Sequence, residues 1–239
     1  NHITCEQKKK ELMEALADIT LDLQSYLVCW NLQKPGDPKA LSNKELKQEI
    51  EWNYQILMCH AGRERVEAIK AEAESIAKSN LMAMTRATDR DHLNTYWGND
   101  YASGLREAMR RGAVTATTNP QLVNTARKEN PDMWDPIRDR ILRENPTSSP
   151  EELGTAMTIE VVLDNAKEMI PIYRATDGKL GYVSLQVNPN NAFDSKSMLE
   201  EALSVYNTVQ ERMGERPNVV FKVPGTSSGV EVVKELTAR

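Results

Sequence analysis

The stretch that decides the fold reads Asn218-Val219-Val220-Phe221-Lys222-Val223-Pro224-Gly225-Thr226-Ser227-Ser228-Gly229. Its β-branched and aromatic run up to Val223 predicts a strand, the Pro-Gly pair ends that strand, and a helix is expected from Ser227 onward. Lys222 interrupts the apolar run. A lysine in the middle of an apolar strand is expected to bury its stem and its amine, and desolvation then favours the neutral amine, a nucleophile that attacks carbonyl carbons. On an edge strand Lys222 would be an ordinary surface residue.

Two further β-type runs end in polar residues. The run 113–118 leads into Thr117-Thr118-Asn119-Pro120, and the run 181–187 carries Ser184 and Gln186 on one face because strand side chains alternate. Active sites of βα architectures lie at the C-terminal ends of the strands. Amides from two strand ends and a lysine from a third therefore predict a pocket, although each group alone is also compatible with a satisfied core polar residue.

The order of these runs indicates a parallel sheet. Strand-like segments alternate with helical segments, as expected for βα units. The predicted strands are 93–97, 113–118, 181–187 and 218–223, and the predicted helices are 101–111, 121–145, 150–170, 195–213 and the segment from 227 onward.

The first 90 residues predict helices only. The segment 6–31 has an apolar stripe, Ser42 with Glu45 forms a capping box for a second helix, and a third helix is expected over 64–84. The members of the stripe include Leu12, Leu16, Ile19 and Leu23. We therefore expect an N-terminal helical extension, 1–88, followed by a βα part, 89–239.

Composition excludes several functional classes. The 239 residues carry 35 acidic and 30 basic side chains, so the net charge of −5 gives no electrostatic reason to bind nucleic acid or an anionic membrane. The sequence contains no run of 18 apolar residues, so it predicts no transmembrane helix. Three cysteines without a Cys-x-x-Cys or His-Glu-x-x-His spacing predict no metal site and suggest reduced thiols in the cytoplasm.

Three segments together resemble the transaldolase family, whose members are Schiff-base-forming aldolases and include the fructose-6-phosphate aldolase-like subgroup. The family pattern is a TTNPSL-like turn, an S-x-E/Q-V strand and a VKIPAT-like strand followed by glycine. The matching segments, in this order, are 112–123, 183–187 and 218–229. The resemblance covers about residues 92–239 and leaves the helical extension unexplained.

The resemblance implies an α/β fold of the transaldolase-type (β/α)8 TIM barrel, of which this chain would hold the first four βα units. A whole barrel takes about 250 residues, more than the matching part provides. Four strands do not close, and an open parallel edge leaves backbone groups unpaired. We therefore expect the remaining strands downstream in the same polypeptide or in a partner.

The resemblance also implies roles for single residues. Lys222 matches the Schiff-base lysine, and Asn119 matches the asparagine that contacts the sugar. Gln186 occupies the position of a carboxylate that holds a catalytic water in typical transaldolases. A glutamine at this position resembles the fructose-6-phosphate aldolase subgroup, and its side chain exchanges no proton at neutral pH. The predicted substrate-binding residues are Asn119, Thr118, Ser184 and Thr226.

The acid/base position is the main departure from the family. Aligned without gaps from Asn119, the family's catalytic aspartate corresponds to Trp97. Either the local alignment slips by two or three residues, or the usual acid/base is absent. For the proton transfers we expect Asp100, the nearby carboxylate, or an ordered water held by Gln186.

The function implied is transfer of a dihydroxyacetone unit between sugar phosphates through a lysine Schiff base, as in the pentose phosphate pathway. The alternatives are aldol cleavage of the fructose-6-phosphate aldolase type, a non-catalytic relative of the family, and an unrelated α/β protein. The implied partners are small sugar phosphates, with no cofactor, no nucleic acid and no membrane. The oligomeric state stays open and includes a homo-oligomer.

Overall fold

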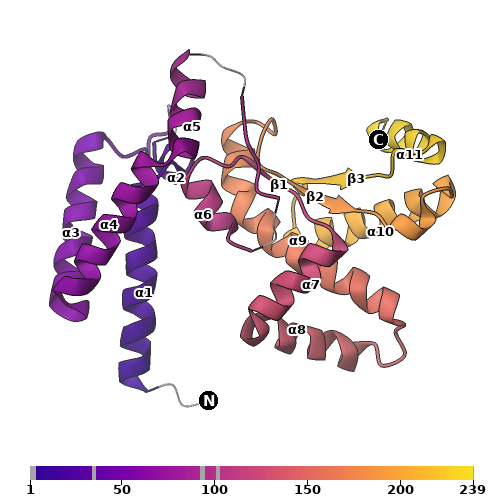
Figure 1. Cartoon of the computed structure of the whole chain (residues 1–239), viewed down its shortest axis with the longest axis horizontal. Coiled ribbons are helices and arrows are strands. Elements are labelled where there is room, and N and C mark those ends of the chain that lie inside the picture. The colour runs from indigo at the N-terminus through magenta and orange to yellow at the C-terminus, as the bar shows by residue number, and fades with distance from the viewer. Residues whose placement is uncertain (1–3, 34–35, 92–94, 101–102, 239) are drawn as a thin grey trace. The chain divides into compact units, whose positions relative to one another are not determined.

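The computed structural model of the chain describes residues 4–33, 36–91, 95–100 and 103–238 (Figure 1). These residues form two compact units, each with its own hydrophobic core. The first unit comprises Asn1–Trp97 with Arg106–Ala113, and the second comprises Gly98–Leu105 with Val114–Arg239.

The first unit is helical, as the sequence predicts. The Thr4 hydroxyl accepts a hydrogen bond from the backbone N–H of Gln7 at the start of the first helix, and Ser42 with Glu45 forms the expected capping box. The helices are α1 (Cys5–Leu23), α2 (Leu27–Asn31), α3 (Asn43–Ala61), α4 (Arg63–Lys78) and α5 (Asn80–Asp91). Within the described ranges, neither unit has a helix with both the length and the apolar content needed to span a bilayer.

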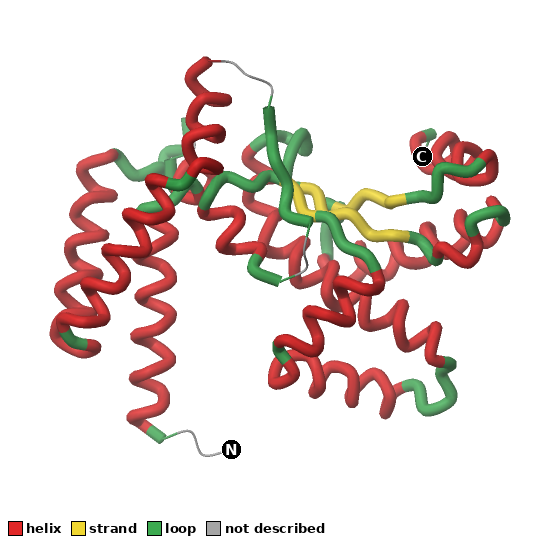
Figure 2. The backbone as a smooth tube through the Cα atoms, viewed as in Figure 1, coloured by secondary structure: helices red, strands yellow, loops and turns green. Residues whose placement is uncertain are grey.

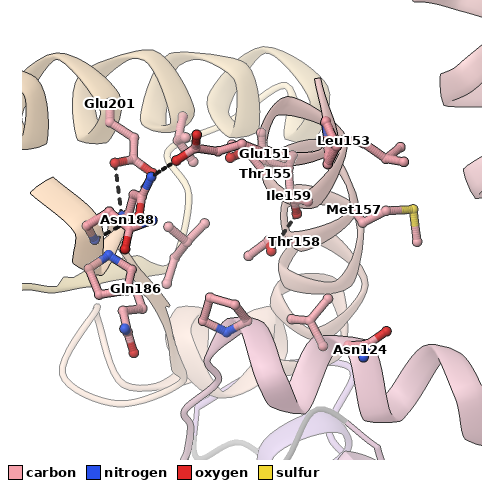
Figure 3. Close-up of a pocket in the computed structure, with 18 of the residues that line it drawn as sticks. Asn124, Glu151, Leu153, Thr155, Met157, Thr158, Ile159, Gln186, Asn188 and Glu201 are labelled. Carbon is pink, nitrogen blue, oxygen red and sulfur yellow. Dashed lines mark hydrogen bonds between the residues drawn. The ribbon is translucent and has the colours of Figure 1, made fainter. Parts of the chain in front are cut away.

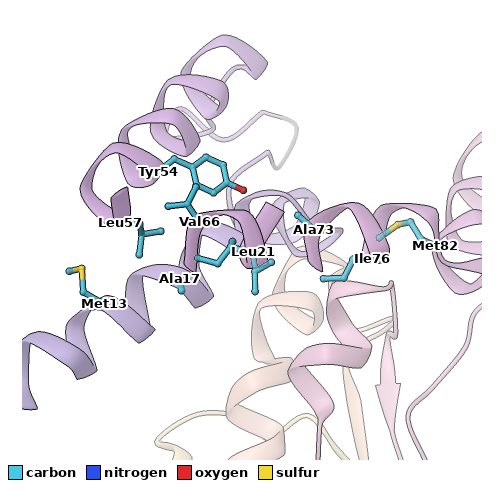
Figure 4. Close-up of a cluster of buried hydrophobic side chains, with 10 residues drawn as sticks. Met13, Ala17, Leu21, Tyr54, Leu57, Val66, Ala73, Ile76 and Met82 are labelled. Atoms are coloured by element: carbon cyan, nitrogen blue, oxygen red, sulfur yellow. The ribbon is translucent and has the colours of Figure 1, made fainter. Parts of the chain in front are cut away.

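α1, α3 and α4 enclose the core of this unit (Figure 4). Its buried side chains are Met13, Ala17, Leu21, Tyr54, Leu57, Val66, Ile69, Ala73, Ile76 and Met82. The stripe predicted on α1 is only partly correct, because Leu12 is 64% exposed and Ile19 is 48% exposed. Apolar residues occupy more than one side of α1, so its packing partners decide which side is buried.

A short helix, α6 (Leu105–Arg110), places most of its residues in the helical unit. The Arg110 side chain, only 3% exposed, pairs with Asp22 (Nε to Oδ1, 2.8 Å), Asp18 (Nη2 to Oδ1, 3.0 Å) and Glu107. Burial opposes the charge of the guanidinium, but the hydrogen bonds from Asp22 and Asp18 and the neighbouring carboxylates outweigh it and raise the pKa of Arg110. A charged network thus attaches α6 to α1.

The second unit contains a three-stranded parallel sheet in the order β1–β2–β3 (Figure 2). β1 is Thr115–Ala116, β2 is Tyr182–Gln186 and β3 is Val219–Lys222. The other elements are α7 (Pro120–Glu129), α8 (Pro131–Glu144), α9 (Pro150–Ala175), the 3-10 turn η1 (Pro189–Asn191), α10 (Ser195–Met213) and α11 (Ser227–Thr237). Strands and helices alternate as the sequence predicts.

The two faces of the sheet differ. One face, with Val187 and Phe221, packs against α10 and α11 through Met198, Ala202 and Val232. The other face carries Ser184 and Gln186 from β2, in register with Val220 and Lys222 from β3. The polar groups of the strands therefore lie opposite the face that α10 and α11 cover.

The strand predicted over 93–97 is not present at residues 95–97, and residues 93–94 lie outside the described residues. The chain instead meets β1 at Asn99, which forms a parallel bridge with Ala116. Gly98 permits this approach, because a Cβ there would lie 2.5 Å from Cγ2 of Thr115. The pairing point is thus two residues later than expected.

Several predicted boundaries also shift. The helix predicted over 101–111 begins only at Leu105, with residues 101–102 outside the described residues. The segment 121–145 forms two helices because Asn130-Pro131 interrupts it. The Ser149 capping box before α9 is confirmed, but α9 continues past Pro171 to Ala175.

Candidate active site

Gln186 and Lys222 are neighbours at the C-terminal ends of adjacent parallel strands. Their Cα atoms are partners in the β2–β3 register, so both side chains leave the same face of the sheet. The backbone N–H of Val187 donates to the carbonyl oxygen of Lys222 at 3.2 Å and extends the pairing by one step. The structure thus brings together two residues that are 36 positions apart in the chain.

Asp100 lies at the end of the extended segment that pairs with β1. The backbone N–H of Asn99 donates to Thr115 O at 2.9 Å, and the backbone N–H of Thr117 donates to Asn99 O at 2.8 Å. The next residue, Asp100, accepts a hydrogen bond from the Thr117 hydroxyl through Oδ1. The register carries Asp100 and Thr117 onto the same face as Ser184, so one polar face contains Asp100, Thr117, Ser184, Gln186 and Lys222.

The burial expected for Lys222 is not observed. Lys222 is the last residue of β3 and its side chain is exposed, as is that of Val220 on the same face. Gln186 is half-buried and Asp100 is exposed. The expectation of a desolvated amine was wrong for the described residues, because the elements they form leave this part of the polar face open.

Two predicted substrate-binding residues cap helices in this structure. Asn119 Oδ1 accepts from the backbone N–H of Leu122 at 3.0 Å, which begins α7. The Thr226 hydroxyl accepts from the backbone N–H of Gly229 at 3.0 Å and donates to the carbonyl oxygen of Ala192. The side chains of both residues therefore stabilise the start of the helix that follows each strand.

The other two predicted binding residues have buried hydroxyl groups. Thr118 is 1% exposed and Ser184 is 8% exposed, and neither hydroxyl has a hydrogen-bond partner among the described residues. Ser184 lies on the polar face, whereas strand alternation places Thr118 on the opposite face from Thr117. A buried hydroxyl without a partner is costly, so Ser184 remains available to a ligand or a water.

A cavity of about 710 Å³ lies beside the end of β2 (Figure 3). Gln186 lines it, but Lys222 and Asn119 are not among its lining residues. Its walls come mainly from α7, α9 and α10, including Val123, Leu153, Met157 and Val205, and Leu185 of β2 also lines it. The cavity is therefore a separate space from the exposed end of Lys222.

Two carboxylates at this cavity were missed by the sequence reasoning. Glu151 accepts from the Asn188 side-chain amide, and Glu201 accepts from the Asn188 backbone N–H (Figure 3). Burial and the nearby Glu151 raise the pKa of Glu201, although the hydrogen bond from Asn188 opposes the shift. The sequence marks Glu151 only as an acidic residue in the first turn of α9, next to the capping-box residue Glu152. Among described residues, no three His, Cys, Asp or Glu side chains gather as metal ligands would.

The sequence model of one family matches this part of the chain. It is described as Transaldolase/Fructose-6-phosphate aldolase, and it matches residues 102–239, more than half of the chain. The chain belongs to this family. The match contains β1, β2 and β3 with Gln186 and Lys222, but it begins after Asp100.

Curated transaldolases are similar over the same region. The transaldolase of Thiobacillus denitrificans is 32% identical over 126 residues, which cover 53% of this chain and 33% of that protein. The transaldolase of Acidothermus cellulolyticus is 30% identical over 149 residues, covering 62% of this chain and 36% of that protein. For the Helicobacter pylori transaldolase, the identity is 29% over 130 residues, covering 54% and 38%. The chain thus spans about a third of the length of these transaldolases.

Membership of the transaldolase family implies a TIM-barrel type of fold. The described sheet has the parallel order and the alternating helices of such a fold. Its three strands and the bridge at Asn99 are the parts observed here.

Proposed function

We propose that this chain carries the Schiff-base half of a transaldolase site. The observation that supports this most is the register pair Gln186–Lys222, with Asp100 on the same face at the end of the segment that pairs with β1. A nucleophile, an amide and a carboxylate then lie at the edge of a parallel sheet where TIM-barrel enzymes hold their catalytic groups.

The proposed reaction begins with a ketose phosphate. The amine of Lys222 adds to the ketone carbon, one water leaves, and a protonated imine forms. The imine accepts the electron pair of the C3–C4 bond as a base removes the proton of the C4 hydroxyl, so an aldehyde phosphate leaves. The enamine that remains adds to an acceptor aldehyde, and water then hydrolyses the new imine. The net result is transfer of a dihydroxyacetone unit between sugar phosphates.

Asp100 is the proposed general acid/base. Its carboxylate accepts from the Thr117 hydroxyl, which orients it at the strand end. Trp97 is not a rival for the position, because its indole N–H donates to Oγ1 of Thr85 at 3.2 Å within the helical unit. The pairing at Asn99 supports the shifted alignment considered in the sequence analysis. Gln186 would hold a water without exchanging a proton.

The remaining assignments follow from this site. Asn119, Thr118, Ser184 and Thr226 are proposed to bind substrate. Among the described residues, the Ser184 hydroxyl on the polar face has no hydrogen-bond partner. We propose that the segment at Asn99 and the three strands are the first four strands of the barrel, with residues 1–88 as an extension that holds no catalytic group. The three cysteines, without a disulfide spacing in the sequence, suit a reducing compartment such as the cytoplasm.

Aldol cleavage without an acceptor is the second candidate. Gln186, in place of the family's usual carboxylate, favours it, since glutamine at this position is similar to the fructose-6-phosphate aldolase subgroup. The two reactions share the imine on Lys222 and differ in the second step. Release of free dihydroxyacetone from fructose 6-phosphate without an acceptor aldehyde separates them.

Borohydride trapping tests the proposal in the natural polypeptide that contains these residues. With fructose 6-phosphate or dihydroxyacetone present, reduction of the imine should add the ketose mass to the peptide carrying Lys222. Lys222→Ala should lose the label. Lys234→Ala, which changes an exposed lysine on the following helix, should keep it. Wild-type protein without label, tested with several ketoses, would favour the non-catalytic relative.

A further inference from the structure

Asn188 lies two residues beyond Gln186, and hydrogen bonds from three elements converge on it (Figure 3). Its backbone N–H donates to both carboxylate oxygens of Glu201 on α10, at 3.1 Å to Oε1 and 3.0 Å to Oε2. Its side-chain amide donates to Glu151 in the first turn of α9, and its Oδ1 accepts from the Asn190 N–H in η1 at 3.0 Å. The chain is thus fixed at the point where it leaves β2.

Gln186 is the last residue of β2, and hydrogen bonds hold the two residues that follow it. On the sheet side, Val187 is fully buried and its N–H donates to Lys222 O at 3.2 Å. On the helix side, Glu201 holds the next N–H along the chain. The path of the backbone after Gln186, and with it the direction of the Gln186 amide, depends on both attachments.

The surroundings of Glu201 disfavour the charged form of its carboxylate. It is partly buried in the cavity wall, and a second carboxylate, Glu151, shares its partner Asn188. These surroundings raise the pKa of Glu201, so the fold would gain from an uncharged residue there if packing were the only requirement. What the carboxylate supplies is an acceptor with two oxygens for a single backbone N–H.

We propose that Glu201 is a positioning residue for Gln186: by holding the Asn188 N–H, it fixes the end of β2 and places the Gln186 amide beside the amine of Lys222. The inference rests on the proposed function, because it gives the Gln186 amide a task at the imine. Glu201 touches no reacting atom and acts only through the backbone.

The test compares Glu201→Ala, Glu201→Gln and the control Glu200→Ala. Glu200 neighbours Glu201 on α10, but it is exposed and pairs only loosely with Lys196 at 3.8 Å. Turnover is measured per active site, with active sites counted as the end-point borohydride label on Lys222. Glu201→Ala should lower kcat per labelled site about tenfold or more, because a displacement of about 1 Å can cost about 10²-fold. KM should change much less, Glu201→Gln should restore most of kcat, and Glu200→Ala should match wild type.

A second variant removes the same hydrogen bond from the donor side. Asn188 has φ −55°, which proline adopts without strain, so Asn188→Pro deletes the N–H and keeps the backbone path. Asn188→Ala is its control, since both substitutions lose the side-chain amide and only proline loses the N–H. Asn188→Pro should lower kcat per labelled site more than Asn188→Ala does, and this comparison decides the matter if Glu201→Ala fails to fold.

The contrary results are distinct. If Glu201 only stabilises the fold, Glu201→Ala lowers the labelled fraction and leaves kcat per labelled site unchanged, which overturns the inference alone. Equal kcat values for Asn188→Pro and Asn188→Ala do the same. Wild-type protein that never labels overturns the proposed function, and the positioning role with it.

Discussion

The proposed chemistry of this chain depends on single residues at the strand ends. Asp100 is attached to β1 through Asn99 and Thr117, and we propose it for the acid/base role to which the ungapped alignment assigns Trp97. The Asp100→Asn variant tests its role. General acid/base catalysis contributes about 10²–10⁴-fold, so we expect kcat to fall by about that factor while Lys222 still labels with borohydride.

Asp132 provides the control for this variant. It lies exposed in the first turn of α8, and Asp132→Asn should leave kcat unchanged. Unchanged turnover in Asp100→Asn, with normal labelling of Lys222, would keep the lysine assignment and remove the acid/base assignment.

Gly229 allows the loop after Lys222 to close. A Cβ at this position would lie 1.9 Å from the carbonyl oxygen of Pro224, whereas a Cβ at Gly225 meets nothing within 4 Å. Overpacking typically costs about 1–3 kcal/mol, so Gly229→Ala should lower the free energy of unfolding by at least that much. Urea denaturation checks this: the midpoint should fall for Gly229→Ala and change little for Gly225→Ala.

The sequence identified Lys222 and Gln186 correctly as strand-end residues, because both follow β-branched runs that end in turn residues. The sequence did not predict that the segment before Asp100 pairs with β1. This pairing is a single bridge at Asn99 beside Gly98, and so short a contact leaves no hydrophobic periodicity in the sequence. The role of Glu201 could not be predicted either. In the sequence it resembles any solvated helix residue, and only the structure shows its hydrogen bond to the chain that follows β2.

At the scale of elements, Glu160 on α9 links α8 to α10. It pairs with Arg140 at 2.7 Å and with Arg212 at 2.8 Å and is 12% exposed. Burial opposes its ionisation, but the hydrogen bonds and charges of Arg212 and Arg140 outweigh it and lower the pKa of Glu160 from the ordinary 4.5. A lowered folded-state pKa stabilises the fold above pH 4.5, and this contribution is lost as the pH falls through the folded value.

We therefore expect Glu160→Gln to lower Tm at pH 7, with the difference from wild type shrinking below about pH 4.5. The difference in stability at pH 7 should be on the order of 1 kcal/mol, because both arginines are partly exposed. Glu211→Gln on the exposed side of α10 is the control. A Tm difference that stays constant from pH 7 to pH 3 would show that the ion pairs contribute nothing.

Elements with strong local signals matched their predictions, and weakly marked ones did not. The capping boxes at Ser42 and Ser149 mark the starts of α3 and α9 correctly. The run 113–118 forms only a two-residue strand, because its pairing depends on β2 and on Asn99 rather than on its own β propensity. Packing against other elements, absent from any local pattern, also decides which side of α1 is buried.

At the scale of the whole molecule, removing residues 1–88 should harm solubility more than chemistry. The deletion takes away Asp18 and Asp22 and leaves the buried guanidinium of Arg110 without two of its partners. An unpaired buried charge costs about 3–5 kcal/mol, so we expect a lower soluble yield than for the undeleted protein. The soluble fraction should still label on Lys222, as mass spectrometry can check. A folded, soluble truncation that no longer labels would place a required group in the helical segment.

The path of the chain between the two units limits how the helical unit can be exchanged by recombination. The chain leaves the helical unit after Trp97, returns at Arg106 and leaves again after Ala113. A single recombination point near residue 97 would therefore join a foreign set of helices to an α6 whose Arg110 pairs with Asp18 and Asp22 in this protein. The helical unit therefore cannot be exchanged as one continuous segment. An exchange that keeps it folded must include residues 106–113, or it must preserve Asp18, Asp22 and Arg110 together.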